Sequence, residues 1–129
     1  YRMINDTIDL LDARIINLGI DFTIVAQAEE NKFTVLKRAE KALRRQFLQI
    51  PEIGESINIS DIYRIINNVD GVSDTIDVSV VRKTGGSYSG VNYNVRDNTS
   101  FDGRYVTFPE DAVYEIRFIE KDIRGAILG

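Results

Sequence analysis

Residues 50–72 read IPEIGESINISDIYRIINNVDGV, and this stretch decides the fold. Pro51 cannot continue a helix that arrives from its N-terminal side, because its ring clashes with the preceding turn and it has no N–H to donate. We therefore expect one helix to end near Gln49. Ser60 is a good N-cap, and Asp61 places negative charge at the positive end of a helix. A second helix is therefore expected to begin there.

This second helix is predicted to be short, with a single buried stripe. Its apolar residues recur at the three- and four-residue spacing of one helical face, at Ile62, Ile65, Ile66 and Val69. Gly71 stands where a left-handed residue is wanted after the helix ends. Taken alone, the stretch is a connector between two helices and carries no chemistry.

The preceding segment, residues 31–49, predicts the long helix of the domain. Asn31 can cap it, and apolar residues recur at helical spacing, at Phe33, Leu36, Ala39 or Leu43, and Phe47. Neither Gly nor Pro interrupts the segment, and its other residues are good helix formers. The expected helix has about 18 residues.

The same segment carries most of the positive charge. The segment contains six basic residues and one acidic residue, so its net charge is +5. The whole chain has a net charge of −4, so the rest of the chain carries −9. The side away from the apolar stripe gathers Lys37, Lys41, Arg44 and Arg45. Three interpretations remain open: a solvated face, a surface for an acidic protein partner, or a surface for a phosphate backbone.

Two strands are predicted from a period-two alternation of apolar and polar residues, at residues 20–27 and 74–83. Residues 104–108 and 112–119 flank a Pro-Glu-Asp turn and predict a final hairpin. A short helix is expected at residues 4–12. The tail from residue 121 onward is short and mixed. Its apolar residues, Ile123, Ile127 and Leu128, need something to cover them and would form a modest sticky patch if exposed.

These elements predict one α+β domain over residues 1–129. Each helix has one apolar stripe and each strand has one apolar face. The natural arrangement is a two-layer sandwich, with two main helices on one face of a mostly antiparallel sheet of three or four strands.

Residues 85–103 show no periodicity and form a long loop, which is uncommon inside a compact domain and usually functional or mobile. Its aromatic residues, Tyr88, Tyr93 and Phe101, are either anchors for a partner or side chains that fold back onto the domain. Its glycines do not match a phosphate-binding loop, so we expect no nucleotide site.

The composition argues against an enzyme. The 129 residues include no His and no Cys, which removes the commonest general base and the usual ligands of transition metals. We therefore expect no catalytic residues, no cofactor, no metal and no small-molecule substrate. No apolar run approaches the length of a membrane span, so no membrane association is expected.

A family resemblance suggests a role. The segment Ile53-Gly54-Glu55-Ser56 through Ser60-Asp61-Ile62-Tyr63 to Asp70-Gly71-Val72 resembles the C-terminal region of baseplate wedge proteins of contractile-tailed bacteriophages, the baseplate J-like family. The likeness covers roughly residues 12–81. The ending, from Asp102-Gly103-Arg104-Tyr105 to Asp122-Ile123-Arg124-Gly125, also resembles that of the T4-like wedge subunit.

The resemblance implies a C-terminal fragment of a longer structural protein, which agrees with the absence of an initial Met. Such proteins lie in the virion, in the tail baseplate, and are assembled in the host cytoplasm. They join wedge subunits into the inner ring by contacting copies of themselves, as a homodimer contact between wedges, and other wedge proteins. The alternative is a small nucleic-acid-binding α+β domain that uses the basic helix 31–49.

The residues expected to contact a protein partner come from three regions: the basic helix face, the long loop and the tail. They are Lys37, Lys41, Arg44, Arg45, Tyr88, Tyr93, Ile123, Ile127 and Leu128.

Overall fold

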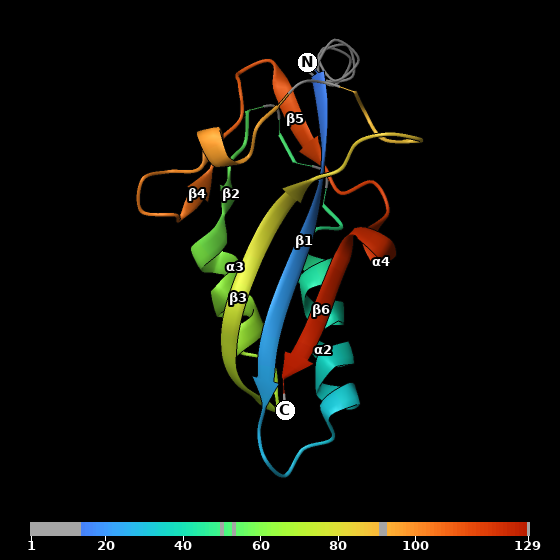
Figure 1. The fold of residues 1–129 in the computed structure, drawn as a ribbon, viewed down its shortest axis with the longest axis vertical. Helices are drawn as coiled ribbons and strands as arrows, with labels where there is room; N and C mark the ends of the chain where they lie inside the picture. Colours follow the sequence, from blue (N-terminus) through green and yellow to red (C-terminus); the bar gives the residue numbers. More distant parts are fainter. Residues whose placement is uncertain (1–13, 50, 53, 91–92, 129) are drawn as a thin grey trace.

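The computed structural model describes residues 14–49, 51–52, 54–90 and 93–128 (Figure 1). The helix predicted at residues 4–12 lies outside the described residues. In chain order the elements are β1 (Arg14–Ala26), α2 (Lys32–Gln46), β2 (Ile57–Asn58), α3 (Ile59–Asn67), β3 (Val72–Arg82), the 3-10 turn η1 (Arg96–Asn98), β4 (Tyr105–Val106), β5 (Ala112–Glu115), α4 (Ile119–Asp122) and β6 (Ile123–Leu128).

Strand β1 organises the main sheet, because three other strands pair with it (Figure 1). β3 runs antiparallel to β1, with Ile20 opposite Val80. β5 pairs in parallel with the first four residues of β1, and β6 pairs in parallel with the stretch from Ile20 to Val25. β1 is therefore longer than the predicted strand, and it begins at Arg14.

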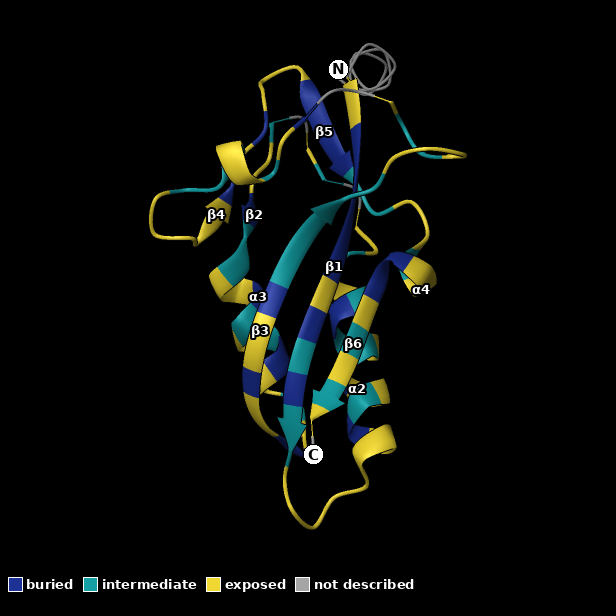
Figure 2. Cartoon of the chain, in the orientation of Figure 1, coloured by how far each residue is buried: buried dark blue, intermediate teal, exposed yellow. Residues whose placement is uncertain are grey.

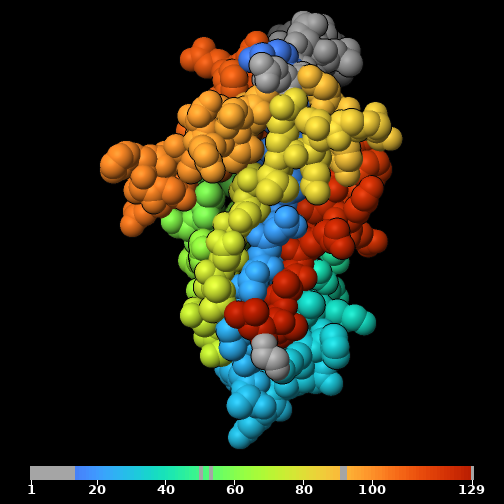
Figure 3. Space-filling model, in the orientation of Figure 1, coloured from blue at the N-terminus to red at the C-terminus, as the bar shows by residue number. Residues whose placement is uncertain are grey.

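Helices α2 and α3 cover one face of this sheet (Figure 1). Alternate residues of β1 are buried on the helix side: Ile16, Leu18, Ile20, Phe22 and Ile24. They meet Val35, Ala39 and Leu43 of α2 and Ile62 and Ile66 of α3 in one core cluster (Figure 2). The two-layer α+β sandwich predicted from the sequence is confirmed. Figure 3 shows the opposite side of the sheet, where β1 lies between β3 and β6.

Helix α2 begins where the sequence predicts. The Asn31 side chain accepts a hydrogen bond from the backbone N–H of Thr34 at 3.1 Å, which satisfies one of the free donors of the first turn. The helix ends at Gln46, three residues before the expected end. The prediction that Phe33 faces the core is wrong, because its side chain is 74% exposed. The buried stripe instead begins at Val35, so it is rotated from the predicted one.

Helix α3 is capped by Asn58 and not by Ser60. The Asn58 side chain accepts from the backbone N–H of Asp61 at 3.3 Å, and the helix starts one residue later. Gly71 follows the helix with a φ of 93°, as expected for a left-handed residue. A Cβ at Gly71 would also lie 2.7 Å from Cγ2 of Val35, so glycine is required there for space as well.

The predicted C-terminal hairpin is wrong. β4 pairs with β2, where Ile57 lies opposite Val106, and β5 pairs with β1. β2 and β1 are both distant in sequence from the strands that they pair with. The turn between β4 and β5 therefore does not connect two strands that pair with each other. The tail is also ordered, because β6 extends the main sheet.

Candidate protein-interaction surface

A groove of about 570 Å³ lies between α2 and α4, and we call it the basic groove. Its lining residues are Lys37, Lys41, Arg44, Arg45, Leu48 and Ile119, together with the acidic Glu40 and Glu120. All four basic residues that the sequence suggested for partner contact therefore lie together. Helical spacing explains this, because residues three, four, seven and eight apart share one face of a helix.

Arg44 differs from the other basic residues of the groove. Its guanidinium donates to the backbone carbonyls of Ile119 at 3.2 Å, Glu120 at 2.8 Å and Ile123 at 2.9 Å. The side chain is only 25% exposed. Arg44 therefore holds α4 and the start of β6 against α2, and its donors are used inside the domain.

Lys37, Lys41 and Arg45 remain exposed. Across the described residues, none of these three side chains forms a hydrogen bond or an ion pair. Leu48 lies in the turn after α2 and is 67% exposed, and Ile119, which also lines the groove, is half-buried. The groove thus presents three free cations beside an apolar end.

The loop tyrosines have different environments. Tyr93 folds back onto the domain: it is 7% exposed, its hydroxyl donates to the carbonyl of Thr107 at 2.7 Å, and its ring stacks on Phe108 at 5.2 Å. Burial raises the pKa of Tyr93 to about 12. The buried alternative left open by the sequence is therefore the observed one, and Tyr93 is not an exposed anchor. Phe101 is fully exposed.

Tyr88 is half-buried and joins the loop to α4. Its hydroxyl donates to Oδ1 of Asp122 at 2.8 Å, and this hydrogen bond raises the pKa of Tyr88. Its ring meets Phe118 edge to face at 5.6 Å. The Asp122 carboxylate, 1% exposed, also accepts from the backbone N–H of Phe118 at 3.2 Å. Sequence reasoning missed Asp122, because an acidic residue in a mixed tail gives no signal of burial.

The three tail residues suggested for partner contact are not equivalent. Ile123 is completely buried opposite Ile20, so it is covered within the domain and is not available as a surface contact. Ile127 is half-buried, and Leu128 is 50% exposed. Alternate residues of a strand face opposite sides, which places Ile123 and Ile127 on one face of β6 and Leu128 on the other.

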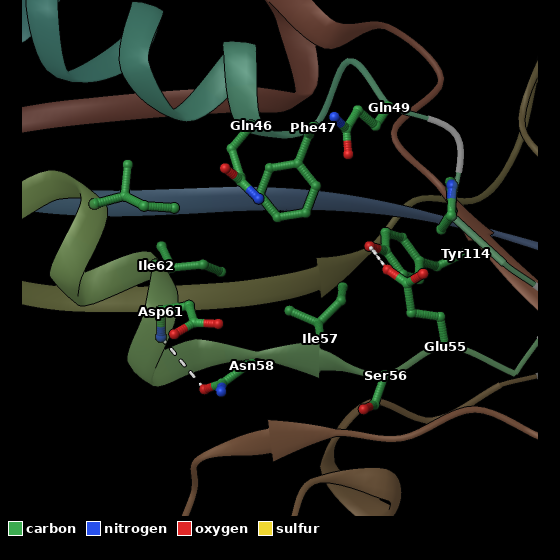
Figure 4. A pocket seen from close by; sticks show the side chains of 12 residues that line it. Gln46, Phe47, Gln49, Glu55, Ser56, Ile57, Asn58, Asp61, Ile62 and Tyr114 are labelled. Carbon is green, nitrogen blue, oxygen red and sulfur yellow. Dashed lines mark hydrogen bonds between the residues drawn. The ribbon is translucent and has the colours of Figure 1, made fainter.

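A second, more polar pocket of about 180 Å³ lies beyond the C-terminal end of α2 (Figure 4). The Tyr114 hydroxyl donates to Oε2 of Glu55 at 3.2 Å, and burial raises the pKa of Tyr114, so the phenol stays neutral. Oε1 of Glu55 accepts from the backbone N–H of Glu52, and Oδ1 of Asp61 pairs with Arg64. Because these carboxylates already have partners, the basic groove is the better candidate site.

Comparison with known proteins adds no relative: no protein-family model and no curated protein matches the chain. Within the described residues, no group of three or more His, Cys, Asp or Glu side chains is placed to hold a metal ion. No helix in the part of the chain that the structure describes is long and apolar enough to cross a membrane.

Proposed function

We propose that this chain is a structural module of a contractile phage tail baseplate that joins wedge subunits through protein–protein contacts. In this role it lies in the virion and contacts both copies of itself, as a homodimer between wedges, and other wedge proteins. The proposed role involves no catalytic step and no cofactor.

The basic groove is the observation that carries this proposal. Lys37, Lys41 and Arg45 are exposed cations without partners among the described residues, and Leu48 adds apolar area beside them. Free charge beside exposed apolar area suits a surface that recognises another protein, because charge sets orientation and apolar burial supplies affinity.

The resemblance to baseplate wedge proteins supports the same role. The segment that carries it forms β2, α3 and the turn into β3. Helix α3 packs against β3 and against α2, the helix that carries the cations of the basic groove.

Nucleic-acid binding through helix 31–49 is the second candidate, and the same three cations favour it. Two features of the groove weigh against it. Glu40 and Glu120 would face a phosphate backbone. The guanidinium of Arg44 already donates hydrogen bonds to backbone carbonyls of the domain itself. Binding to phosphates would weaken steeply with salt, which gives a direct test.

The experiment that tests the proposal is co-assembly. The full-length protein containing this chain is mixed with the other wedge proteins of the same phage, and complexes are measured by size-exclusion chromatography with light scattering, over a dilution series at low and moderate salt. We expect stoichiometric complexes that persist at moderate salt. A folded protein that associates with neither itself nor any wedge protein would overturn the proposal.

A further inference from the structure

We infer that the basic groove binds an acidic amphipathic helix of another protein. This inference rests on the proposed function in one respect, that the helix belongs to a partner subunit. The sequence left an acidic protein partner as one of three interpretations, and the inference adds the helical form and the charge spacing of that partner.

The spacing of the free cations defines where the partner's charges must lie. Lys37, Lys41 and Arg45 are each four residues apart on α2. At the rise of an α-helix they are therefore about 6 Å apart along its axis. Carboxylates at every fourth position of a second helix repeat at the same distance. Such a helix can place one carboxylate opposite each cation.

The apolar end of the groove defines one more position on the partner helix, which must carry an apolar residue. Leu48 lies in the turn that follows α2, three residues beyond Arg45, and is 67% exposed; the half-buried Ile119 also lines the groove. An aliphatic residue one turn beyond the last carboxylate would cover both side chains. The ligand is therefore amphipathic and not simply acidic, because burial of apolar area supplies affinity that exposed ion pairs do not.

The hydrogen bonds around the groove favour a helix over an extended strand. The carbonyls of Ile119, Glu120 and Ile123 already accept from Arg44. The backbone N–H of Gly125 donates to Glu40 at 3.1 Å. An incoming strand would find these backbone groups occupied, whereas a helix satisfies its own.

The lining of the groove favours a protein over a nucleic acid. None of the groove's lining residues carries an aromatic ring on which a nucleobase could stack. Glu120 can accept hydrogen bonds from polar side chains at the edge of a protein ligand.

Designed peptides test the inference on the full-length protein. The first peptide is helical, with Glu at three positions four residues apart and Leu three residues beyond the last. A second carries the same residues with the Glu positions scattered around the helix, and a third has Gln in place of Glu. Fluorescence anisotropy measures Kd for each peptide, and for a DNA duplex as competitor.

We expect the patterned peptide to bind at least about tenfold more tightly than the scattered and neutral peptides, because only it aligns charge with the apolar contact. The Lys41→Glu, Arg45→Glu double variant should weaken binding of the patterned peptide by about tenfold or more. The control, Lys32→Glu with Arg124→Glu, makes the same charge change at exposed positions outside the groove and should change Kd by less than about twofold. Leu48→Ala should weaken only the patterned peptide.

Three results would overturn the inference: equal binding of patterned and scattered peptides, unchanged Kd in the groove variant, or displacement of the peptide by the DNA duplex. The co-assembly experiment separates this failure from that of the proposed function. If the groove variant still assembles with wedge proteins, the groove inference fails while the assembly role stands. If the unmodified protein does not assemble, the assembly role fails whatever the peptides do.

Discussion

The Glu40 carboxylate accepts a hydrogen bond from the backbone N–H of Gly125 at 3.1 Å. Arg44, one turn further along α2, donates to the carbonyl of Ile123 on the same strand at 2.9 Å. Two side chains of a helix thus occupy backbone groups on the outer edge of β6. An exposed strand edge is a template for pairing with other chains, so these contacts protect it.

Replacement of Arg44 by Ala should destabilise the domain. The change removes hydrogen bonds to three carbonyls, and hydrogen bonds to charged groups contribute more than neutral ones, so we expect a loss of about 2–3 kcal/mol in the free energy of unfolding. Arg45→Ala is the matched control, because its side chain is exposed, and it should change stability by less than about 0.5 kcal/mol. Urea unfolding followed by circular dichroism measures both. Equal effects would show that the three contacts do not stabilise the fold.

Gly125→Ala should destabilise the domain by overpacking. A Cβ at this position would lie 2.6 Å from Cε1 of Phe22 and 2.8 Å from Cδ1 of Leu36, so we expect a loss of about 1–3 kcal/mol in the free energy of unfolding. Gly90→Ala is the control, because a Cβ there meets nothing within 4 Å. Thermal unfolding of the two variants gives the comparison. A Gly125 variant as stable as the Gly90 variant would mean that β6 shifts without cost.

Tyr88→Phe should loosen the loop that begins at Gly85. The variant keeps the ring contact with Phe118 and loses only the hydrogen bond to Asp122. We expect severalfold faster proteolytic cleavage near Gly85 and Gly86, because local opening precedes cleavage. Tyr105→Phe, at an exposed position, serves as control. Unchanged cleavage would show that this hydrogen bond does not restrain the loop.

Stability should fall at alkaline pH. In the folded protein burial raises the pKa of Tyr93 to about 12, whereas in the unfolded chain the pKa of the phenol stays near its ordinary value of 10.0. The stabilising contribution is therefore fully present below pH 10 and is lost as pH rises from there toward 12. The folding equilibrium constant should fall by up to about tenfold per pH unit for this group.

Tyr93→Phe tests the assignment. Stability curves from pH 8 to pH 12 should be less steep for the variant, because it removes one titrating phenol. Tyr114 retains its own raised pKa, so part of the slope should remain. An identical slope in both proteins would exclude Tyr93 as a source of the alkaline loss.

The parts of the fold that the sequence predicted are those with strong local periodicity. The alternation around Phe22 and Val78 gave β1 and β3, and the spacing of Ile62 and Ile66 gave α3. Asn31 correctly marked the start of the long helix, whereas Pro51 placed its end three residues too late. In each case a short stretch contains both the signal and its physical cause.

The parts that were missed depend on distant partners. Nothing in the mixed tail shows that Ile123 lies opposite Ile20. Parallel strands are not joined by a tight turn, so no turn residues in the sequence indicate the pairing. The predicted hairpin failed for the same reason, since Val106 pairs with Ile57.

The candidate site was predicted in part. Helical spacing placed Lys37, Lys41 and Arg45 on one face correctly. It did not reveal that Arg44 is used internally, because the carbonyls it contacts belong to α4 and β6, far away in sequence. Tyr93 was an open alternative for a similar reason, since its burial depends on Phe108.

The central position of β1 has a consequence for synthesis on the ribosome. β1 is made early, but the strand that pairs with its stretch from Ile20 to Val25 is β6, which is made about a hundred residues later. Until then the nascent sheet has an unprotected edge. Premature release of the chain before Ile123 would leave that edge bare and favour pairing between chains. A stalled or truncated product of this chain should therefore depend on chaperones more than the completed one.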